Sequence, residues 1–460
     1  MNTSQMSHLV PTRAERFRGG DAVDVAIVGA GAAATLLVTA LKQHQPGAAV
    51  AVVGTGHIPG RGVAYSTTDA QHRMNVPVRG LSVDADGSDH LPRWLAAHGH
   101  PAESGTYLPR ATYGAYLADQ LAGSGADVVD GLVVAITGDG TTMWRVELAD
   151  GRAIIARQVV LATGPPPGPG PLDLPEHPRV LADPWAPDLA ARAAHAGRVV
   201  VLGSGLTMVD VALTATAAGA TVEAISRHGW LPTAHPEPRA TPRAPFPIPA
   251  APLTAEQLRQ LVVDRALAEP AGWAAGMDAA RDHANELWAL LPADEQAKVL
   301  RQMLTAWTIH RHRMSPPVAA RLAVLQAANR VRVHSGTVTA VRVIGDEVEL
   351  SGHRGERWTG GLLVACTGPS ADIGRTTDPL LRHLIGTGLA VVGPHRLGLA
   401  VDPRGQLVGP DGGARPGLFA LGLLRRGTVF ETTAIPEIRA QAVALAPLLA
   451  TAACTPVPGR

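Results

Sequence analysis

The fold is decided by Asp24–Leu41, which reads DVAIVGAGAAATLLVTAL. The first residues are apolar and β-branched, as in a buried strand, and the last ones favour a buried helix. Between them, Gly29, Gly31 and Ala34 form the pattern GxGxxA. The first glycine of this pattern allows a tight turn, the second lets a pyrophosphate approach the backbone, and the small third residue lets helix and strand pack closely. A second apolar strand at Val50–Val53 completes a βαβ unit, so the stretch predicts a dinucleotide-binding domain.

The same arrangement occurs a second time, with its first glycine 174 residues later. Arg198–Leu202 is expected to be a strand, Gly203 and Gly205 form the glycine turn, and Val222–Ile225 is the next strand. Each half also ends in an apolar run followed by a Thr-Gly pair, which is Thr163-Gly164 in the first half and Thr367-Gly368 in the second. The simplest interpretation is an internal duplication. We therefore predict an α/β chain with two Rossmann-like dinucleotide-binding domains and a helical insertion.

Proline-rich and glycine-rich connectors suggest where the domains begin and end. The predicted parts are a flexible leader at 1–22, a discontinuous first domain at 23–170 plus 371–460, a second domain at 196–231 plus 326–370, and an insertion at 232–325. The insertion begins Pro-rich and then becomes helical and rich in tryptophan. It is either a small helical cap or a lid over the bound nucleotides, and the two interpretations are compatible.

Composition excludes several classes of protein. The 460 residues carry a net charge of +1, so no large basic field would attract nucleic acid or an acidic membrane. The two cysteines, Cys366 and Cys454, are far apart, which excludes a disulfide scaffold, a thiolate zinc site and a dithiol redox pair. Val25–Leu41 is uncharged and close to the roughly 17-residue minimum for a membrane span, but a glycine turn explains it better. No signal peptide is recognised at the start, so we expect a cytoplasmic protein, with a homo-oligomer possible.

The ends of the second strands distinguish the two nucleotide sites. A ribose-binding acid is expected at the end of the second strand, but the first half has Val53-Gly54-Thr55-Gly56 there. The adenosine ribose must then be held by backbone, by Thr55 or by His57, or be held weakly. In the second half the strand ends in Ser226-Arg227-His228, and an arginine there suits the 2′-phosphate of NADPH. Two nucleotide sites without a dithiol indicate FAD reduced by NADPH.

Several longer stretches carry a resemblance to a known family. They are GRGVAYSTTDAQHRMNVPVRGLS at 60–82, YLPRATYGAYL at 107–117, GSGLTMVDVAL at 203–213, ISRHGWLPTAH at 225–235, WTIHRHRMSPP at 307–317, ACTGP at 365–369 and LFALGLLRRGTVFETTAIPEIRAQA at 418–442. With these stretches the chain resembles the FAD/NAD(P)-binding family that includes flavin-dependent N-oxidising enzymes of the nitrosuccinate synthase kind. More distantly it resembles the ornithine and lysine N-hydroxylases. That family usually carries an acid where this chain has Gly54.

The resemblance implies which residues lie near the flavin. Arg61, Gly62, Asn75 and Pro77 are expected beside it, and Gly422 with Thr432-Thr433 at its ribityl or ring end. Asn75 is the one candidate catalytic residue, with a turn-forming amide beside Pro77 as the alternative. From the sequence itself, Thr432 or Thr433 could cap the following helix, whose N-terminus would stabilise a reduced, anionic flavin.

The basic run at the end of the insertion is open to several interpretations. His310, Arg311 and Arg313 could bind an acidic group of the substrate, contact NADPH phosphates, or form a solvated helix face. No cysteine or carboxylate stands near the two histidines, His310 and His312, so no metal site is predicted.

These observations lead to a predicted function. We expect NADPH to reduce FAD and the reduced flavin to form a C4a-(hydro)peroxyflavin with O2, which oxidises the nitrogen of a small amine or amino acid. One alternative is an NADPH-dependent flavin oxidoreductase that transfers no oxygen. Another is a degenerate nucleotide-binding sensor or partner subunit, which the missing acid at the end of the first unit's second strand would suit.

Overall fold

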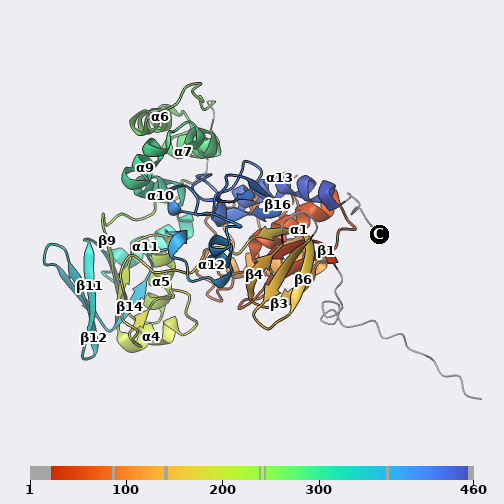
Figure 1. The fold of residues 1–460 in the computed structure, drawn as a ribbon. Coiled ribbons are helices and arrows are strands. Elements are labelled where there is room, and N and C mark those ends of the chain that lie inside the picture. Colours follow the sequence, from red (N-terminus) through yellow and green to blue (C-terminus); the bar gives the residue numbers. More distant parts are fainter. Residues whose placement is uncertain are drawn as a thin grey trace, which may run out of the picture.

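The chain folds around two parallel sheets, with a helical lobe beside them (Figure 1). The structure is a computed structural model that describes residues 22–84, 89–138, 143–237, 240–242, 245–368 and 372–453. The predicted leader therefore lies almost wholly outside the described residues, as does Cys454. Among the described residues, no helix combines the length and apolarity that a membrane crossing requires.

The first unit is built on an eight-stranded sheet. Its main strand order is β15-β16-β6-β1-β2-β3, and β4 and β5 extend from β6 as an antiparallel meander. The strands are β1 (Ala22–Val28), β2 (Val50–Gly54), β3 (Asp127–Asp130), β4 (Val133–Thr137), β5 (Trp144–Leu148), β6 (Ala153–Leu161), β15 (Gln406–Val408) and β16 (Ala414–Ala420). Strands β16, β6, β1, β2 and β3 run parallel, as the βαβ pattern predicts. Strands from both ends of the chain therefore build one sheet.

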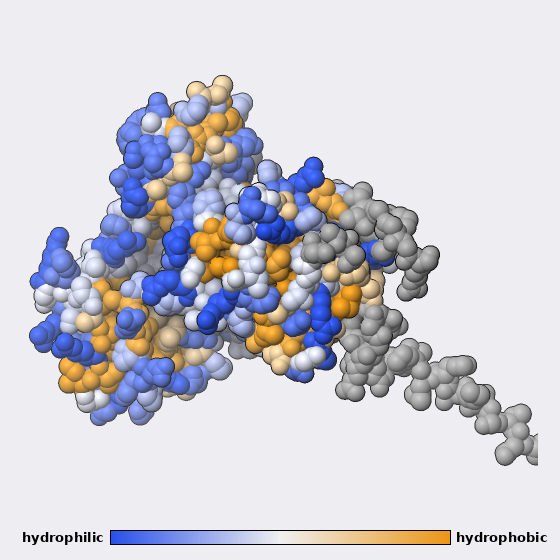
Figure 2. Space-filling view, viewed as in Figure 1, coloured by the Kyte–Doolittle hydropathy of each residue, from blue (hydrophilic) through white to orange (hydrophobic). Residues whose placement is uncertain are grey.

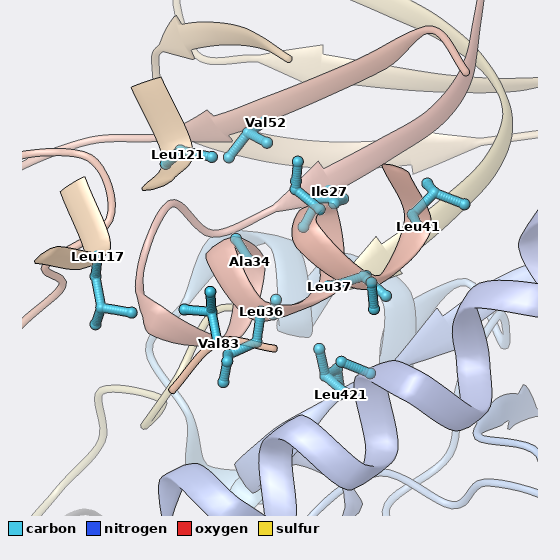
Figure 3. Close-up of a cluster of buried hydrophobic side chains, with 14 of the residues drawn as sticks. Ile27, Ala34, Leu36, Leu37, Leu41, Val52, Val83, Leu117, Leu121 and Leu421 are labelled. Atoms are coloured by element: carbon cyan, nitrogen blue, oxygen red, sulfur yellow. The ribbon is translucent and has the colours of Figure 1, made fainter. Parts of the chain in front are cut away.

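Both faces of this sheet are covered, which explains the continuous apolar runs of its strands. On one face Ile27 and Val52 share a core with four helices, and on the other face Ala26 and Val53 share one with the meander and a fifth helix. The helices of the first unit are α1 (Ala32–His44), α2 (His90–Ala97), α3 (Arg110–Gly123), α12 (Pro379–Gly386) and α13 (Ile435–Ala453). Figure 3 shows Leu37 of α1 within this core, and burial of each such leucine contributes roughly 1.5–3 kcal/mol.

The second unit repeats the parallel arrangement on a smaller scale. Its sheet has the order β10-β9-β8-β14-β7, and all its pairs are parallel. The strands are β7 (Val180–Leu181), β8 (Arg198–Leu202), β9 (Thr221–Ser226), β10 (Val331–Ser335) and β14 (Leu362–Ala365). A separate three-stranded sheet of β11 (Val338–Ile344), β12 (Glu347–Gly352) and β13 (Arg357–Gly360) packs on it. The helices of this unit are α4 (Leu189–Ala196), α5 (Leu206–Ala217) and α11 (Pro316–Ala327).

The insertion forms a small helical bundle at one end of the molecule. It contains α6 (Ala255–Ala268), α7 (Trp273–Asp282), α8 (Ala284–Ala289), α9 (Ala293–Gln302) and α10 (Leu304–Arg311). Trp288 is buried in its core and stacks on Phe430 of the first unit, with ring centroids 5.0 Å apart. Hydrophobic residues on the visible surface are scattered among hydrophilic ones (Figure 2).

The predicted fold class is confirmed, since two sheets with parallel cores and a helical insertion are present. The exact domain limits remain our interpretation. In the structure β7 is already part of the second sheet, and α4 and α11 both pack in the core of the second unit.

Candidate functional site: two glycine crevices

The first crevice lies at the carboxyl end of β1 and requires its first glycine. Gly29 has φ +110°, and its N–H donates to the carbonyl of Val53, 2.7 Å away. A Cβ added at this position would lie 2.2 Å from the carbonyl oxygen of Ala162. Only glycine combines this backbone angle with such a close approach, so the turn exposes the free N–H groups at the start of α1.

The second crevice repeats this geometry at the end of β8. Gly203 has φ +107°, and its N–H donates to the carbonyl of Ile225 at 2.7 Å. A Cβ here would lie 2.4 Å from the carbonyl oxygen of Cys366. The two turns therefore use the same backbone contacts, which agrees with the duplication inferred from the sequence.

The two crevices differ in what lies above the second glycine. In the first, a loop at residues 56–62, which we call the covering loop, folds over the turn: the N–H of Gly60 donates to the carbonyl of Ala30 at 2.7 Å. A Cβ on Gly31 would lie 3.5 Å from the Cα of Gly62. In the second crevice, a Cβ on Gly205 would meet no described atom within 4 Å. Among the described residues, then, the first crevice is covered and the second is open.

The two predicted Thr-Gly pairs follow the last parallel strand next to each glycine turn. Gly164 and Gly368 both have positive φ angles, +73° and +78°. The hydroxyl oxygen of Thr163 is buried and has no hydrogen-bond partner among the described residues. A buried hydroxyl without a partner is costly, so this atom is available to a bound polar group. Thr367 and Gly368 are exposed.

The end of β2 shows why the expected acid is missing. A Cβ on Gly54 would lie 2.7 Å from the Cβ of Ala30, so a side chain at this position collides with the glycine turn. Thr55 and His57 are exposed. Asp130 ends the neighbouring strand β3, directly paired with Gly54 in register. Because paired residues of parallel strands present their side chains to the same face, the exposed Asp130 faces the same side as the glycine turn.

The end of β9 carries the polar residues predicted for the second nucleotide. The Ser204 hydroxyl in the glycine turn donates to the Ser226 hydroxyl oxygen at 2.8 Å. Arg227 and His228 are exposed, and His228 stacks on Trp230 with ring centroids 4.6 Å apart. The guanidinium of Arg227 is thus open to solvent beside the open crevice.

The residues expected near the ring of the flavin come from two segments that share one core. Met74, Val78 and Leu81 of the segment around Asn75 and Pro77 are in the same hydrophobic cluster as Leu421 and Ile435. The Nε of Arg61 is buried without a hydrogen-bond partner among the described residues. The carbonyl of Asn75 accepts a hydrogen bond from His235 Nε2 at 2.9 Å, which links this segment to the chain that follows β9.

The predicted capping role of the two threonines is wrong. Helix α13 begins at Ile435, so neither threonine directly precedes it. The hydroxyl of Thr432 instead donates to the carbonyl of Gly422 at 2.7 Å and accepts from Gln441 Nε2 at 2.7 Å. Gln441 also accepts a hydrogen bond from the Gly422 N–H. Thr433 is exposed. Thr432 therefore fixes the positive-φ turn at Gly422 rather than the helix end.

A buried ion pair joins the two units, and the sequence did not predict it. Arg110, at the start of α3, lies 2.7 Å from a carboxylate oxygen of Asp210 in α5, and their side chains are 14% and 5% exposed. Burial raises the pKa of Asp210, and the charge of Arg110 opposes this shift. Nearby, His72 Nε2 lies 3.0 Å from the hydroxyl oxygen of Thr214, also on α5. These contacts hold the helix of the second crevice against the first unit.

The basic run of the insertion is buried rather than solvated. Arg311 is 8% exposed and lies 3.4 Å from Glu431 and 3.0 Å from Glu437, while Arg313 is 1% exposed and pairs with Asp278 at 2.8 Å. Both guanidinium groups are therefore engaged inside the protein. No sequence signal would have separated these pairs from a free basic face, because the partners are distant along the chain.

His310 has different surroundings. It lines a cavity of about 400 Å³ together with Trp230 and Ile309, between the end of β9 and α10. Its Nδ1 is buried without a hydrogen-bond partner among the described residues, and burial lowers its pKa. Of the three residues of the basic run, His310 is the one that faces open space. The described residues hold no group of three or more His, Cys, Asp or Glu that could bind a metal.

This geometry defines a chain with two dinucleotide crevices, and the comparisons with known proteins agree with it. Residues 26–166, which contain the first crevice, match a family model described as FAD-NAD(P)-binding. A search of curated proteins gives no match.

Solved structures of the same fold include several flavoenzymes. An ornithine N-hydroxylase from Kutzneria sp. 744, solved with reduced FAD, NADP+ and L-ornithine, has a TM-score of 0.66 at 16% identity, covering 94% of this chain and 99% of that one. A cadaverine monooxygenase from Erwinia amylovora bound to FAD has a TM-score of 0.64 at 14% identity, covering 94% and 95%. A thioredoxin reductase from Lactococcus lactis has a TM-score of 0.51 at 13% identity, covering 94% and 99%. The resemblance to N-hydroxylases inferred from the sequence is thus found in the fold, which reductases share.

Proposed function

We propose that this chain is an FAD- and NADPH-dependent monooxygenase that oxidises the nitrogen of a small amine or amino acid. The observation that carries the proposal is the pair of equivalent glycine turns, Gly29 and Gly203, in two units that the ion pair of Arg110 and Asp210 joins. The similarity of the whole fold to an ornithine N-hydroxylase and a cadaverine monooxygenase supports it. A lone glycine turn is weak support, but two on one chain with this fold favour a two-nucleotide enzyme.

The residues of the first crevice fit FAD. The N–H groups at the start of α1 would hold the pyrophosphate, the unpartnered Thr163 hydroxyl and Arg61 Nε would meet polar atoms of the cofactor, and the covering loop would exclude water. We infer that Asp130 replaces the absent acid and accepts a hydrogen bond from the adenosine ribose. Asn75, Pro77, Gly422 and Thr432 would border the ring end.

The residues of the second crevice fit NADPH. Gly203 and Gly205 would hold its pyrophosphate, with Thr367 and Gly368 across the crevice, and Ser226, Arg227 and His228 would contact its 2′-phosphate. When bound, the two cofactors supply hydride transfer and oxygen activation. The protein supplies orientation: Arg110 and Asp210 fix α5, and Arg311 and Arg313 keep the insertion in place. An amine that is already neutral needs no general base.

Product analysis tests the proposal against its rivals. Protein loaded with FAD is mixed with NADPH, isotopically labelled O2 and a panel of amines and amino acids, and the products are identified by mass spectrometry. We expect a hydroxylamine or nitroso product that carries the label. Complete recovery of the oxygen as H2O2, with no oxidised amine, would instead identify a flavin oxidoreductase. Protein that binds no FAD would favour a sensor or partner subunit.

A further inference from the structure

A cavity of about 600 Å³ lies apart from both glycine turns, between the insertion and α13. Its wall on α13 is formed by Ala440, Gln441 and Ala444, which lie on a different side of the helix from Ala442 and Ala446, the residues packed toward α1. The volume is in the range of pockets that bind small metabolites. None of its lining residues was predicted as part of a site.

Of the three acidic residues that line this cavity, Glu431 and Glu437 have close partners, and the exposed Asp282 lies 3.9 Å from Arg281. Glu437 accepts a hydrogen bond from Arg281 Nε at 2.8 Å and another from Arg311 at 3.0 Å. Glu431 accepts from Trp307 Nε1 at 2.7 Å and lies 3.4 Å from Arg311. Although burial alone would raise the pKa of Glu437, Arg311 and Arg281 leave it lowered, so this carboxylate stays charged and paired.

Arg425, in the cavity wall, has no such close partner in the described part of the chain, and Asp402 only partly offsets the effect of burial on its pKa. Arg425 is 9% exposed, makes no ion pair with the described residues, and its Nε has no hydrogen-bond partner among them. Its Nη2 donates a long hydrogen bond to the carbonyl of Pro403, 3.3 Å away. Burial lowers its pKa, which reflects the cost of keeping this charge out of water. Arg404, which is exposed, also lines the cavity.

The surroundings of Arg425 indicate what would bind there. Guanidinium pairs best with a carboxylate, which can accept two parallel hydrogen bonds. Apolar side chains such as Val429 and Leu448 line part of the cavity and suit a short hydrocarbon chain. Gln441 separates the cavity from the Gly422 turn, since its amide bonds both the Gly422 N–H and the Thr432 hydroxyl. An occupant would therefore lie one side chain away from the residues expected at the ring end of the flavin.

We propose that this cavity binds the carboxylate of an amino acid on Arg425, so that the substrate is an amino acid rather than a simple amine. The identification of the occupant as substrate rests on the proposed function, but the predicted binding does not.

The experiment measures binding to FAD-loaded protein by calorimetry and by thermal shift. The probes are paired compounds that differ only in the carboxylate: L-amino acids with their primary amides, and L-lysine with cadaverine. We expect at least one amino acid to bind about tenfold or more tightly than its uncharged or decarboxylated counterpart, as for a charge-assisted hydrogen bond. In Arg425→Gln this difference should disappear, whereas Arg425→Lys should keep part of it and Arg357→Gln, far from the cavity and 72% exposed, should keep all of it.

Three results would overturn the proposal: equal binding of amides and amino acids, binding of inorganic phosphate in place of carboxylates, or no binding by any member of the panel. If Arg425→Gln does not fold, the comparison of amino acids with their amides in the wild-type protein still tests the carboxylate preference. The flavin spectrum and its bleaching by NADPH are recorded in the same samples without ligand. Failure of that bleaching counts against the proposed function, and failure of the carboxylate preference counts against the cavity alone.

Discussion

In the first crevice a Cβ on Gly31 would lie in van der Waals contact with Gly62 of the covering loop, 3.5 Å away, whereas in the second crevice a Cβ on Gly205 would meet no described atom within 4 Å. The turns beneath are the same, with Gly29 and Gly203 donating to equivalent carbonyls at 2.7 Å. Under the proposed function, the two units differ in ligand because their surroundings differ. A covered crevice suits a cofactor that stays bound, and an open one suits a cosubstrate that must enter and leave in each cycle.

The largest expected effects on nucleotide binding come from substitutions at the two turn glycines. In Gly29→Ala the added carbon meets Ala162, and in Gly203→Ala it meets Cys366, both at positive φ. We expect Gly29→Ala to lose FAD binding entirely. Gly203→Ala should still bind FAD but show no bleaching of the flavin by NADPH, with full bleaching by dithionite. Absorbance spectra of the purified variants measure both properties, and loss of FAD from Gly203→Ala alone would contradict the assignment of the crevices.

A second variant weakens the contact between the two units without altering either glycine turn. Replacing Arg110 by Gln leaves the buried carboxylate of Asp210 unpaired, and removal of one partner of such a pair costs about 3–5 kcal/mol. We expect a lower free energy of unfolding in urea and slower flavin reduction by NADPH, with FAD affinity little changed. The double variant with Asp210→Asn should recover part of the stability, because it removes the unpaired charge. Unchanged stability in Arg110→Gln would show that this pair does not hold the units together.

A third variant tests whether the polar end of β9 distinguishes NADP+ from NAD+. Arg227→Gln removes the exposed guanidinium beside the second crevice, and we expect NADP+ affinity to fall by about tenfold to a hundredfold while NAD+ affinity stays the same. Titration calorimetry measures both dinucleotides. Arg332→Gln, on the neighbouring strand β10, is the matched control and should alter neither. Equal losses for NADP+ and NAD+ would place Arg227 away from the 2′-phosphate.

The smallest expected effect concerns the end of β3. Asp130→Asn should weaken FAD binding by about tenfold, because a carboxylate accepts a stronger hydrogen bond from the ribose hydroxyl than an amide does. Asp127→Asn, at the other end of the same strand and on its opposite face, serves as the control. An FAD analogue that lacks the adenosine 2′-hydroxyl should bind both proteins alike. If Asp130→Asn weakens the analogue as much as FAD, the carboxylate does not act on the ribose.

The sequence predicted what is set by residues close together in the chain. The spacing of Gly29, Gly31 and Ala34, and its recurrence at Gly203, specify strand, turn and helix locally, so the fold class and both crevices followed from it. The contact of Gly54 with Ala30 and the pairing of Gly54 with Asp130 depend on how the strands align, which local patterns do not fix. The sequence therefore shows that an acid is missing at Gly54, but it does not show that Asp130 lies beside this position.

The partners of the charged residues were even less predictable from the sequence. Arg311 and Arg313 read as a basic run, but Glu431, Glu437 and Asp278 bury and neutralise them from other segments. Arg425 also stands beside another arginine in the sequence, but its Nε has no hydrogen-bond partner among the described residues, and Asp402 only partly offsets the lowering of its pKa by burial. Whether an arginine is structural or available to a ligand is decided by distant partners, so only the folded arrangement distinguishes them.

The most direct test of the central claim counts the nucleotides bound by one chain. Protein reconstituted with FAD is passed through gel filtration, its flavin content is measured, and NADP+ is then titrated by calorimetry. We predict that each chain retains one FAD through the column and binds one NADP+ reversibly without releasing the flavin. Displacement of FAD by NADP+, or flavin bound in both crevices, would contradict the division into a covered cofactor site and an open cosubstrate site.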